Sequence, residues 1–343
     1  MPSAIPRGYA CMRVRVLLLL VPLCLPLCAR AQTAGEFLRL GFGARALALG
    51  NSMLSAEGDP ASLYWNPALL ARAARSGAEF MHTENFGGAA GFDAAAVLLP
   101  LKGGGKGEAI GIGVLRLSVD DIPTTSNFQF DDVGADGLPG THDAGEGNGR
   151  WDPGEPVHAD PSKVEFRSDQ EWAVLAGYAR PLGERGAVGV TAKLIRQSLA
   201  GRQSNGAGLD AGASLQLPGG MDLAARVSDL TATRITWDNG LRETIAPQLH
   251  LAVARTSPLG TSSSVRLSLG GATSSWDLVR SGREWHGGLE YSFRDRLFLR
   301  AGDASGGASF GAGLGFARFR VDYAAAPFHD LGATHRLSAL ARW

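Results

Sequence analysis

From about residue 77 to the C-terminus, apolar residues alternate with polar or small ones along most of the chain. In the run 188–195, the even positions hold Val, Val, Ala and Leu, whereas the odd positions hold Gly, Thr, Lys and Ile. The runs 209–217, 221–228 and 319–324 repeat this pattern. A period of two places successive side chains on opposite faces of a β-strand. The pattern therefore predicts a ladder of strands, each with one apolar face.

The runs are long for strands, and short links such as 218–220 (Pro-Gly-Gly) join many of them. They span roughly 9–12 residues, whereas a strand of a soluble protein has about 5–6 and a tilted membrane-spanning strand about 9–11. The sequence thus predicts an all-β fold of about 14 antiparallel strands. The predicted strands are 77–86, 91–101, 108–119, 169–181, 186–199, 205–217, 220–229, 247–256, 263–273, 284–293, 296–303, 307–316, 317–325 and 334–343.

Alternation alone does not say which face of the strands is wet. In a soluble sandwich the apolar faces turn inward and pack on each other. In an outer-membrane barrel the apolar face meets lipid and the polar face lines the lumen, and closure satisfies every backbone group without an edge. The strand length favours a transmembrane outer-membrane β-barrel. A soluble secreted β-protein is the alternative.

Residues 1–31 have the features of a secretory signal peptide. Arg7, Arg13 and Arg15 precede the apolar stretch 16–28, and an Ala-Arg-Ala cleavage site follows it. Removing this segment takes away four arginines, no acidic residue and all three cysteines, so that 29 basic and 33 acidic residues remain. The mature chain is then expected to have no disulfide, and its net charge of −4 argues against nucleic-acid binding.

Residues 32–76 do not follow the two-residue period. Asp59 can cap a helix that begins with Pro60, and Asn66-Pro67 is typical of a second helix start. We therefore expect an N-terminal segment with short helices before the barrel, which we place at 77–343.

The predicted last strand ends on Trp343, which shares a face with Leu337, Ala339 and Ala341. A final strand that ends in an aromatic residue resembles the signal read by the outer-membrane assembly machinery. That machinery is therefore an expected partner, and an ordinary terminal strand is the alternative interpretation.

Several segments resemble one known family. Residues 41–50 (GFGARALALG) and 59–69 (DPASLYWNPAL) resemble the opening of the PorV/PorQ family within the FadL-like barrels. The ending, DYA at 322–324 and LGATHRLS at 331–338, is similar to the ending of that family, and 189–210 resembles its middle. The resemblance extends over nearly the whole mature chain.

The resemblance implies a fourteen-stranded barrel in the outer membrane of a Gram-negative cell, with residues 32–76 in or against the lumen. Some relatives serve type IX secretion, as carriers of secreted proteins or as surface attachment factors. Secreted proteins and secretion-system components are thus implied partners, beside outer-membrane lipid. We expect a non-enzymatic barrel that assists secretion or surface attachment. The alternatives are a FadL-like channel for hydrophobic small molecules and a structural surface protein.

Residues 120–168 interrupt the ladder with an acidic segment rich in Gly and Pro. Calcium loops need alternating oxygen ligands, a glycine at position six and an acid at position twelve, and the windows 132–143 and 144–155 each match in part. The interpretation is a calcium-ordered extracellular loop, because periplasmic turns of barrels are short. A flexible, solvated acidic loop is the alternative. The candidate ligands are Asp132, Asp136, Asp143, Glu146, Asn148, Asp152 and Glu155.

Little else in the sequence indicates chemistry. It shows no G-x-S-x-G nucleophile elbow, because the one match, GASFG at 307–311, lies inside a predicted strand rather than at a strand-to-helix turn. It also shows no nucleophilic cysteine in the mature chain and no histidine pair with a metal-ligand spacing. A barrel enzyme that assembles its site across strands is the remaining enzymatic alternative. We expect no catalytic residue, no required cofactor and no nucleic-acid partner.

Overall fold

The computed structural model describes residues 35–55, 58–85, 88–101, 107–124, 128–159, 164–273, 283–304, 307–328 and 332–343. The predicted signal peptide lies outside these residues. The helices are η1 (Glu36–Arg39), α1 (Ala44–Ala48), α2 (Ser62–Trp65) and η2 (Pro67–Arg72). The strands are β1 (Gly77–Asn85), β2 (Ala90–Pro100), β3 (Ala109–Thr124), β4 (Phe128–Phe130), β5 (Val157–Ala159), β6 (Glu165–Leu182), β7 (Gly186–Leu199), β8 (Arg202–Leu217), β9 (Met221–Ser228), β10 (Thr233–Trp237), β11 (Arg242–Ile245), β12 (Gln248–Leu259), β13 (Ser263–Thr273), β14 (Arg283–Phe293), β15 (Leu297–Ala304), β16 (Gly307–Phe316), β17 (Phe319–Phe328) and β18 (Gly332–Arg342).

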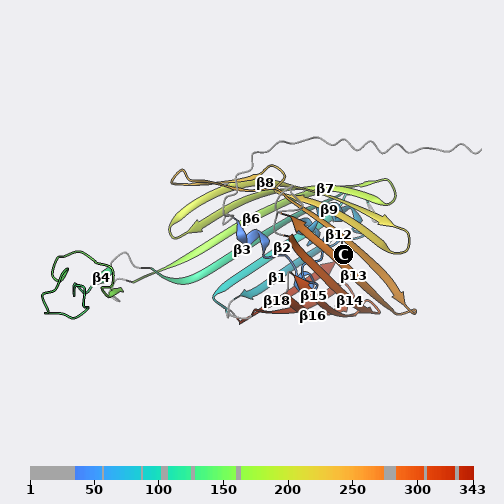
Figure 1. Ribbon diagram of the computed structural model, residues 1–343. Coiled ribbons are helices and arrows are strands. Elements are labelled where there is room, and N and C mark those ends of the chain that lie inside the picture. Colours follow the sequence, from blue (N-terminus) through green and yellow to red (C-terminus); the bar gives the residue numbers. More distant parts are fainter. Residues whose placement is uncertain are drawn as a thin grey trace, which may run out of the picture. The chain divides into compact units, whose positions relative to one another are not determined.

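Fourteen of these described strands form one closed antiparallel ring (Figure 1). Neighbours in the ring follow the chain order, with β3 next to β6 and β9 next to β12. The pairing of β8 with β9 and of β18 with β1 closes it. Each of the fourteen predicted runs lies on one strand of this ring. The prediction of an all-β barrel of about 14 antiparallel strands is therefore confirmed.

Four short described strands lie outside the ring. β10 and β11 form a hairpin that pairs with the first part of β8, with Thr236 opposite Asn205. β4 pairs with β5 inside the acidic insertion. The period-two pattern predicts neither hairpin, because these strands are only three to five residues long.

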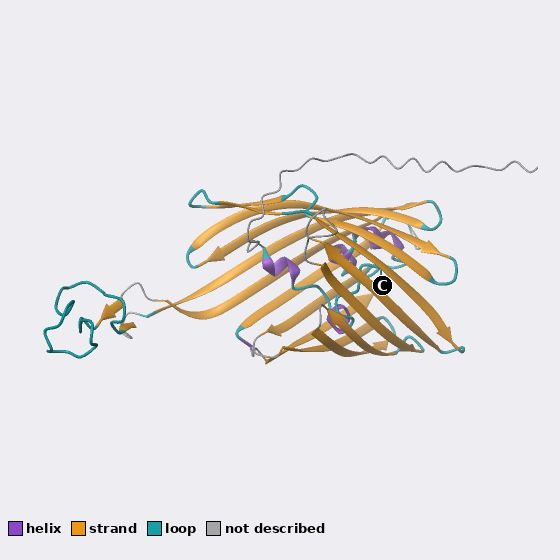
Figure 2. Cartoon of the chain, viewed as in Figure 1, coloured by secondary structure: helices purple, strands orange, loops and turns teal. Residues whose placement is uncertain are grey.

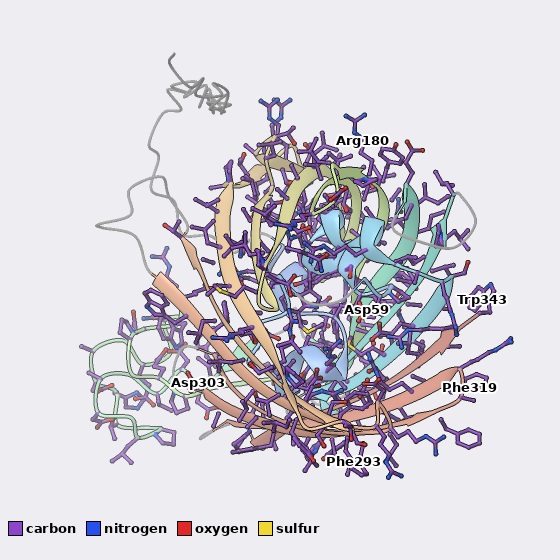
Figure 3. The ribbon with its side chains drawn as sticks, turned by 90° about the vertical axis from the view of Figure 1, so that its right-hand side faces the viewer. Asp59, Arg180, Phe293, Asp303, Phe319 and Trp343 are labelled. Carbon is purple, nitrogen blue, oxygen red and sulfur yellow. The ribbon has the colours of Figure 1, made fainter. Side chains whose placement is uncertain are left out.

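The apolar faces of the ring point outward. On β7, Val190 and Leu194 are 52% and 64% exposed, whereas Thr191 and Lys193 are 1% and 5% exposed. Figure 3 shows Phe319 pointing away from the barrel. A soluble sandwich has the reverse arrangement, with its apolar faces packed together. An apolar exterior around a polar interior is the pattern of strands that contact lipid, so the sandwich alternative is wrong.

The lumen is occupied by residues 35–55 and 58–73, which we call the plug (Figure 2). α1 packs against β15 to β18, and η2 packs against β6, β7 and β8. The expected short helices in the lumen are thus confirmed. Asn66 positions η2, because its side-chain oxygen accepts a hydrogen bond from the backbone N–H of Ala68 and Pro67 takes the first helical position. None of the described helices is long and apolar enough to cross a membrane.

Glycines on the inner face of the wall allow the plug backbone to come close. A side chain on Gly302 would collide with the backbone of Leu49 and Gly50, and one on Gly189 would collide with the backbone of Pro67. At such close approaches only glycine fits without moving the neighbouring chain. The wall and the plug are therefore fitted to each other backbone to backbone.

Candidate functional site

Buried ion pairs on β14, β15 and β17 hold the plug against the lumen wall. Arg300 on β15 donates to Glu290 on β14 (Nε–Oε2, 2.6 Å) and to Asp322 on β17 (Nη1–Oδ1, 2.7 Å). Arg320 donates to the second oxygen of Asp322 at 2.7 Å. Arg45 of the plug forms a two-pronged contact with Glu290, at 2.9 and 2.7 Å. These five buried residues, which we call the arginine network, dock α1 by charge-assisted hydrogen bonds within the barrel wall.

A second set of buried charges lies on β7, β8 and β9 and on the residue that follows β9, Asp229. Lys193 contacts both Asp210 (2.8 Å) and Asp229 (2.6 Å), and Arg226 donates to Asp210 at 2.5 Å. The neighbouring Thr191 hydroxyl donates to the backbone carbonyl of Leu63 in the plug at 3.1 Å. The cations and carboxylates balance one another, as charges removed from water require.

The part of the wall formed by β2, β3 and β6 is apolar, which corrects the expectation of a polar lumen all round. The positions of β2, β3 and β6 that face the plug hold only Ala, Gly, Leu and Phe. They pack against Leu63 and Leu70 of the plug. We call this wall the apolar sector. Its residues are Phe92, Ala94, Ala96, Leu98, Ala109, Gly111, Gly113, Leu115, Ala173, Leu175, Gly177 and Ala179.

The plug and the wall meet closely at the boundary between the apolar sector and the second charge set. A cavity of about 10 Å³ lies there, next to Tyr64, Leu115 and Arg226. A space of this size holds about one water molecule. At this boundary, passage of a larger molecule therefore requires the plug to move.

Ser52 and Ser268 mark one contact where the plug meets the wall. Their hydroxyl oxygens lie 2.6 Å apart, and both side chains are buried. Ser52 also donates to the carbonyl of Leu49 at 2.6 Å. This contact joins the plug to β13 on the charged side of the lumen.

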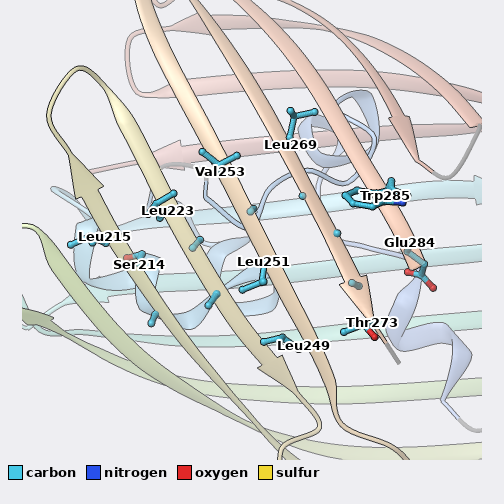
Figure 4. Close-up of a pocket in the computed structure, with 17 residues that line it drawn as sticks. Ser214, Leu215, Leu223, Leu249, Leu251, Val253, Leu269, Thr273, Glu284 and Trp285 are labelled. Carbon is cyan, nitrogen blue, oxygen red and sulfur yellow. The ribbon is translucent and has the colours of Figure 1, made fainter. Parts of the chain in front are cut away.

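The outer wall carries an apolar groove of about 730 Å³ across β8, β9, β12, β13 and β14 (Figure 4). Leu215, Leu223, Leu251 and Leu269 line it, and Trp285 lies at one end. All five side chains are exposed. The groove belongs to the apolar outer face of the barrel, and small residues between these side chains make it concave.

The acidic insertion folds as one unit rather than as two separate loops. Asp132, from the first predicted window, accepts hydrogen bonds from the backbone N–H groups of Asn148 (3.3 Å) and Gly149 (2.7 Å) in the second. Glu155, at the end of the second window, accepts one from Gly134 in the first, at 3.1 Å. The two windows therefore interlock.

The other predicted ligands also bond within the insertion. Asp143 accepts from the backbone N–H of Asp136 at 2.7 Å, and Asn148 donates to Asp152 at 2.7 Å. The backbone N–H groups of Gly140 and His142 donate to Glu146 and lower the pKa of its carboxyl. Among the described residues, no three Asp, Glu, His or Cys side chains lie close enough together to hold a metal ion.

Calcium binding by this insertion remains a prediction. If it occurs, the carboxylates must turn from the backbone N–H groups toward the ion, since Ca²⁺ takes six to eight oxygen ligands. We expect the purified full-length protein to bind Ca²⁺ in an isothermal titration, and Glu155→Ala to remove that binding. If the unaltered protein gives no binding heat at millimolar Ca²⁺, the prediction of a calcium-binding insertion is wrong.

Sequence reasoning marks Arg320 and Asp322 as paired lumen-facing charges but misses Arg45, Glu290 and Arg300, which complete the arginine network. Glu290 and Arg300 occupy inward positions of their strands, so the two-residue period marks them as lumen-facing. Their pairing depends on strand register, and Arg45 reaches Glu290 across 245 residues of sequence. The pattern thus identifies charged lumen positions, but not which of them meet.

The closed ring, the apolar exterior and the filled lumen define the class: a closed fourteen-stranded antiparallel β-barrel of the outer-membrane type. No family model and no curated protein matches the sequence.

Solved structures share this fold. The chain is similar to the CymD monoaromatic hydrocarbon channel (TM-score 0.57, 11% identity, 88% of this chain and 98% of that one). It is also similar to the Ralstonia pickettii toluene transporter TbuX (TM-score 0.51, 11% identity, 88% and 98%). A third likeness is to a Pseudomonas aeruginosa FadL homologue (TM-score 0.52, 12% identity, 87% and 98%). At these identities the likeness establishes the FadL-like barrel fold.

Proposed function

We propose that this protein is a non-enzymatic barrel of the Gram-negative outer membrane that passes hydrophobic small molecules along the apolar sector, with the plug as its gate. The observation that carries the proposal is the inner face of β2, β3 and β6, which holds only Ala, Gly, Leu and Phe where it meets the plug. An apolar solute that enters between plug and wall leaves no buried charge or hydrogen-bonding group without a partner there.

The solved neighbours agree with this proposal in kind. One is described as a monoaromatic hydrocarbon channel, a second as a toluene transporter and a third as a FadL homologue. A lumen that is polar on every side would disfavour a hydrophobic route. The apolar inner wall of β2, β3 and β6 is instead compatible with one.

The proposal is tested by uptake of radiolabelled toluene. The host is a Gram-negative strain that lacks its own channels for hydrophobic compounds, because its outer leaflet then limits entry. Cells that express the protein should take up toluene several-fold faster than cells with an empty vector. Equal rates, with the barrel present and folded in the outer membrane, would contradict the proposal.

A second candidate is the role in secretion or surface attachment that the PorV/PorQ resemblance implies. The ion pairs between plug and wall favour it, because a barrel with a permanently fixed plug acts through its outer loops. Genes for a type IX secretion core should then accompany this gene. Deleting it should also release proteins that this system normally attaches to the surface. A genome without those genes would remove this candidate in its secretion-system form.

A further inference from the structure

A row of polar side chains and one tryptophan crosses the outer face of five neighbouring strands. Strand register pairs His82 on β1 with Asp93 on β2, Asp93 with Arg116 on β3, and Arg116 with Trp172 on β6. Arg196 on β7 is paired with Trp172 in turn. Charged groups on a lipid-facing wall are costly unless they meet a polar partner.

Contacts within the row leave its two arginines available. His82 Nδ1 lies 2.7 Å from Asp93 Oδ1, so Asp93 is mainly engaged with the histidine. Arg116 Nη1 is 3.9 Å from the other oxygen of Asp93, and its guanidinium lies over the Trp172 ring at 5.3 Å. Among the described residues, Arg116 makes no ion pair closer than this 3.9 Å contact, and Arg196 Nη2 donates to the neutral Gln203 at 2.9 Å.

An apolar groove of about 590 Å³ begins directly beside this row. Its lining includes Phe80, Ala95, Val114 and Val174. Each of these residues lies two positions along its strand from a member of the row, and therefore on the same face. The groove continues over β17 and β18. Polar row and apolar groove thus form one continuous amphipathic surface.

We propose that this surface binds an anionic phospholipid of the membrane, with one acyl chain in the groove and the phosphate between Arg116 and Arg196. Residues directly opposite each other on strands two apart have Cα atoms about 10 Å apart, so both guanidinium groups can reach one phosphate across Trp172. Arginine forks match phosphate oxygens in pairs.

The charges around the row favour that position for the phosphate. Glu84 and Asp93 lie on the His82 side, with Glu84 4.0 Å from His82 Nε2. The arginines flank Trp172 on the other side. At the 730 Å³ groove, by contrast, the charged lining residue is the acidic Glu284, which pairs with Arg39. An anionic headgroup is therefore directed to the smaller groove.

The proposal rests on the proposed membrane location, and native mass spectrometry of the purified protein tests it. The probes are dioleoyl phosphatidylglycerol and dioleoylglycerol, which share their acyl chains but differ in the phosphate. The double variant Arg116→Gln/Arg196→Gln should retain phosphatidylglycerol at least about tenfold less well, since the loss of one charge-assisted contact already gives that factor and the variant loses two. It should retain dioleoylglycerol unchanged. Ala95→Leu, which fills the groove, should weaken both.

Arg180→Gln is the matched control, since Arg180 is an exposed arginine near the other end of β6 (Figure 3). It should retain phosphatidylglycerol as the unaltered protein does. Equal retention by the double variant, or equal loss in the control, would overturn the proposal. Toluene uptake by the double variant separates the two proposals. If phosphatidylglycerol binding depends on the two arginines but neither the unaltered protein nor the double variant takes up toluene, only the channel proposal is contradicted. If both take up toluene but retain phosphatidylglycerol equally, only the lipid site is contradicted.

Discussion

A disulfide between residues 52 and 268 is expected to abolish toluene uptake, and reduction is expected to restore it. The hydroxyl oxygens of Ser52 and Ser268 are 2.6 Å apart and buried, so Ser52→Cys/Ser268→Cys brings two sulfur atoms into bonding reach. The mature chain is predicted to have no other cysteine. The bond ties the plug to β13, and a tied plug cannot leave the apolar sector.

The two single variants are the controls for this experiment. Each carries one cysteine and cannot form the bond, so each should transport like the unaltered protein in oxidising and reducing conditions. If the oxidised double variant still takes up toluene at the unaltered rate, the plug is not the gate, and the proposed route along the apolar sector is wrong.

Removal of the central cation of the arginine network is expected to destabilise the barrel strongly. Arg300→Met leaves Glu290 and Asp322 buried with one cation fewer between them. Breaking a buried ion pair by removing one partner costs about 3–5 kcal/mol. Urea unfolding of the protein in lipid vesicles should show a loss of that size.

The surface residue Arg318, in the turn between β16 and β17, supplies a matched control. Arg318→Met should change the free energy of unfolding by less than about 0.5 kcal/mol. Adding Glu290→Gln to Arg300→Met should recover part of the loss, because it removes one uncompensated charge. Equal free energies of unfolding for Arg300→Met and Arg318→Met would contradict the claim that the arginine network holds the plug.

The sequence predicts the ring well because lipid and lumen impose opposite demands on alternate residues. β7 shows this most clearly, with Val190 and Leu194 outside and Lys193 inside. The hairpin of β10 and β11 lies in a stretch that is too short and too irregular to show the two-residue period. The pattern therefore predicts a loop there.

The lumen is harder to predict, since its character depends on which strands are neighbours. In 92–98 the sequence is Phe-Asp-Ala-Ala-Ala-Val-Leu, where alanines fall on both faces and hide the fully apolar inner side of β2. The charges that grip the plug are visible as single residues. Which of them pair is decided by the strand register and by a contact between Arg45 and Glu290, which lie 245 residues apart in the sequence.

Leu194 and Ile195 offer the most direct measurement of the face assignment, because they are adjacent and equally apolar but point to opposite faces. Leu194 is 64% exposed and Ile195 is 3% exposed. A nitroxide on Leu194→Cys in lipid vesicles should collide readily with oxygen, which concentrates in the bilayer, and not with a water-soluble nickel complex. The same label on Ile195→Cys should collide little with either. A label at 195 that is more open to oxygen than one at 194, or nickel access at both, would contradict a barrel with lipid outside and a filled lumen.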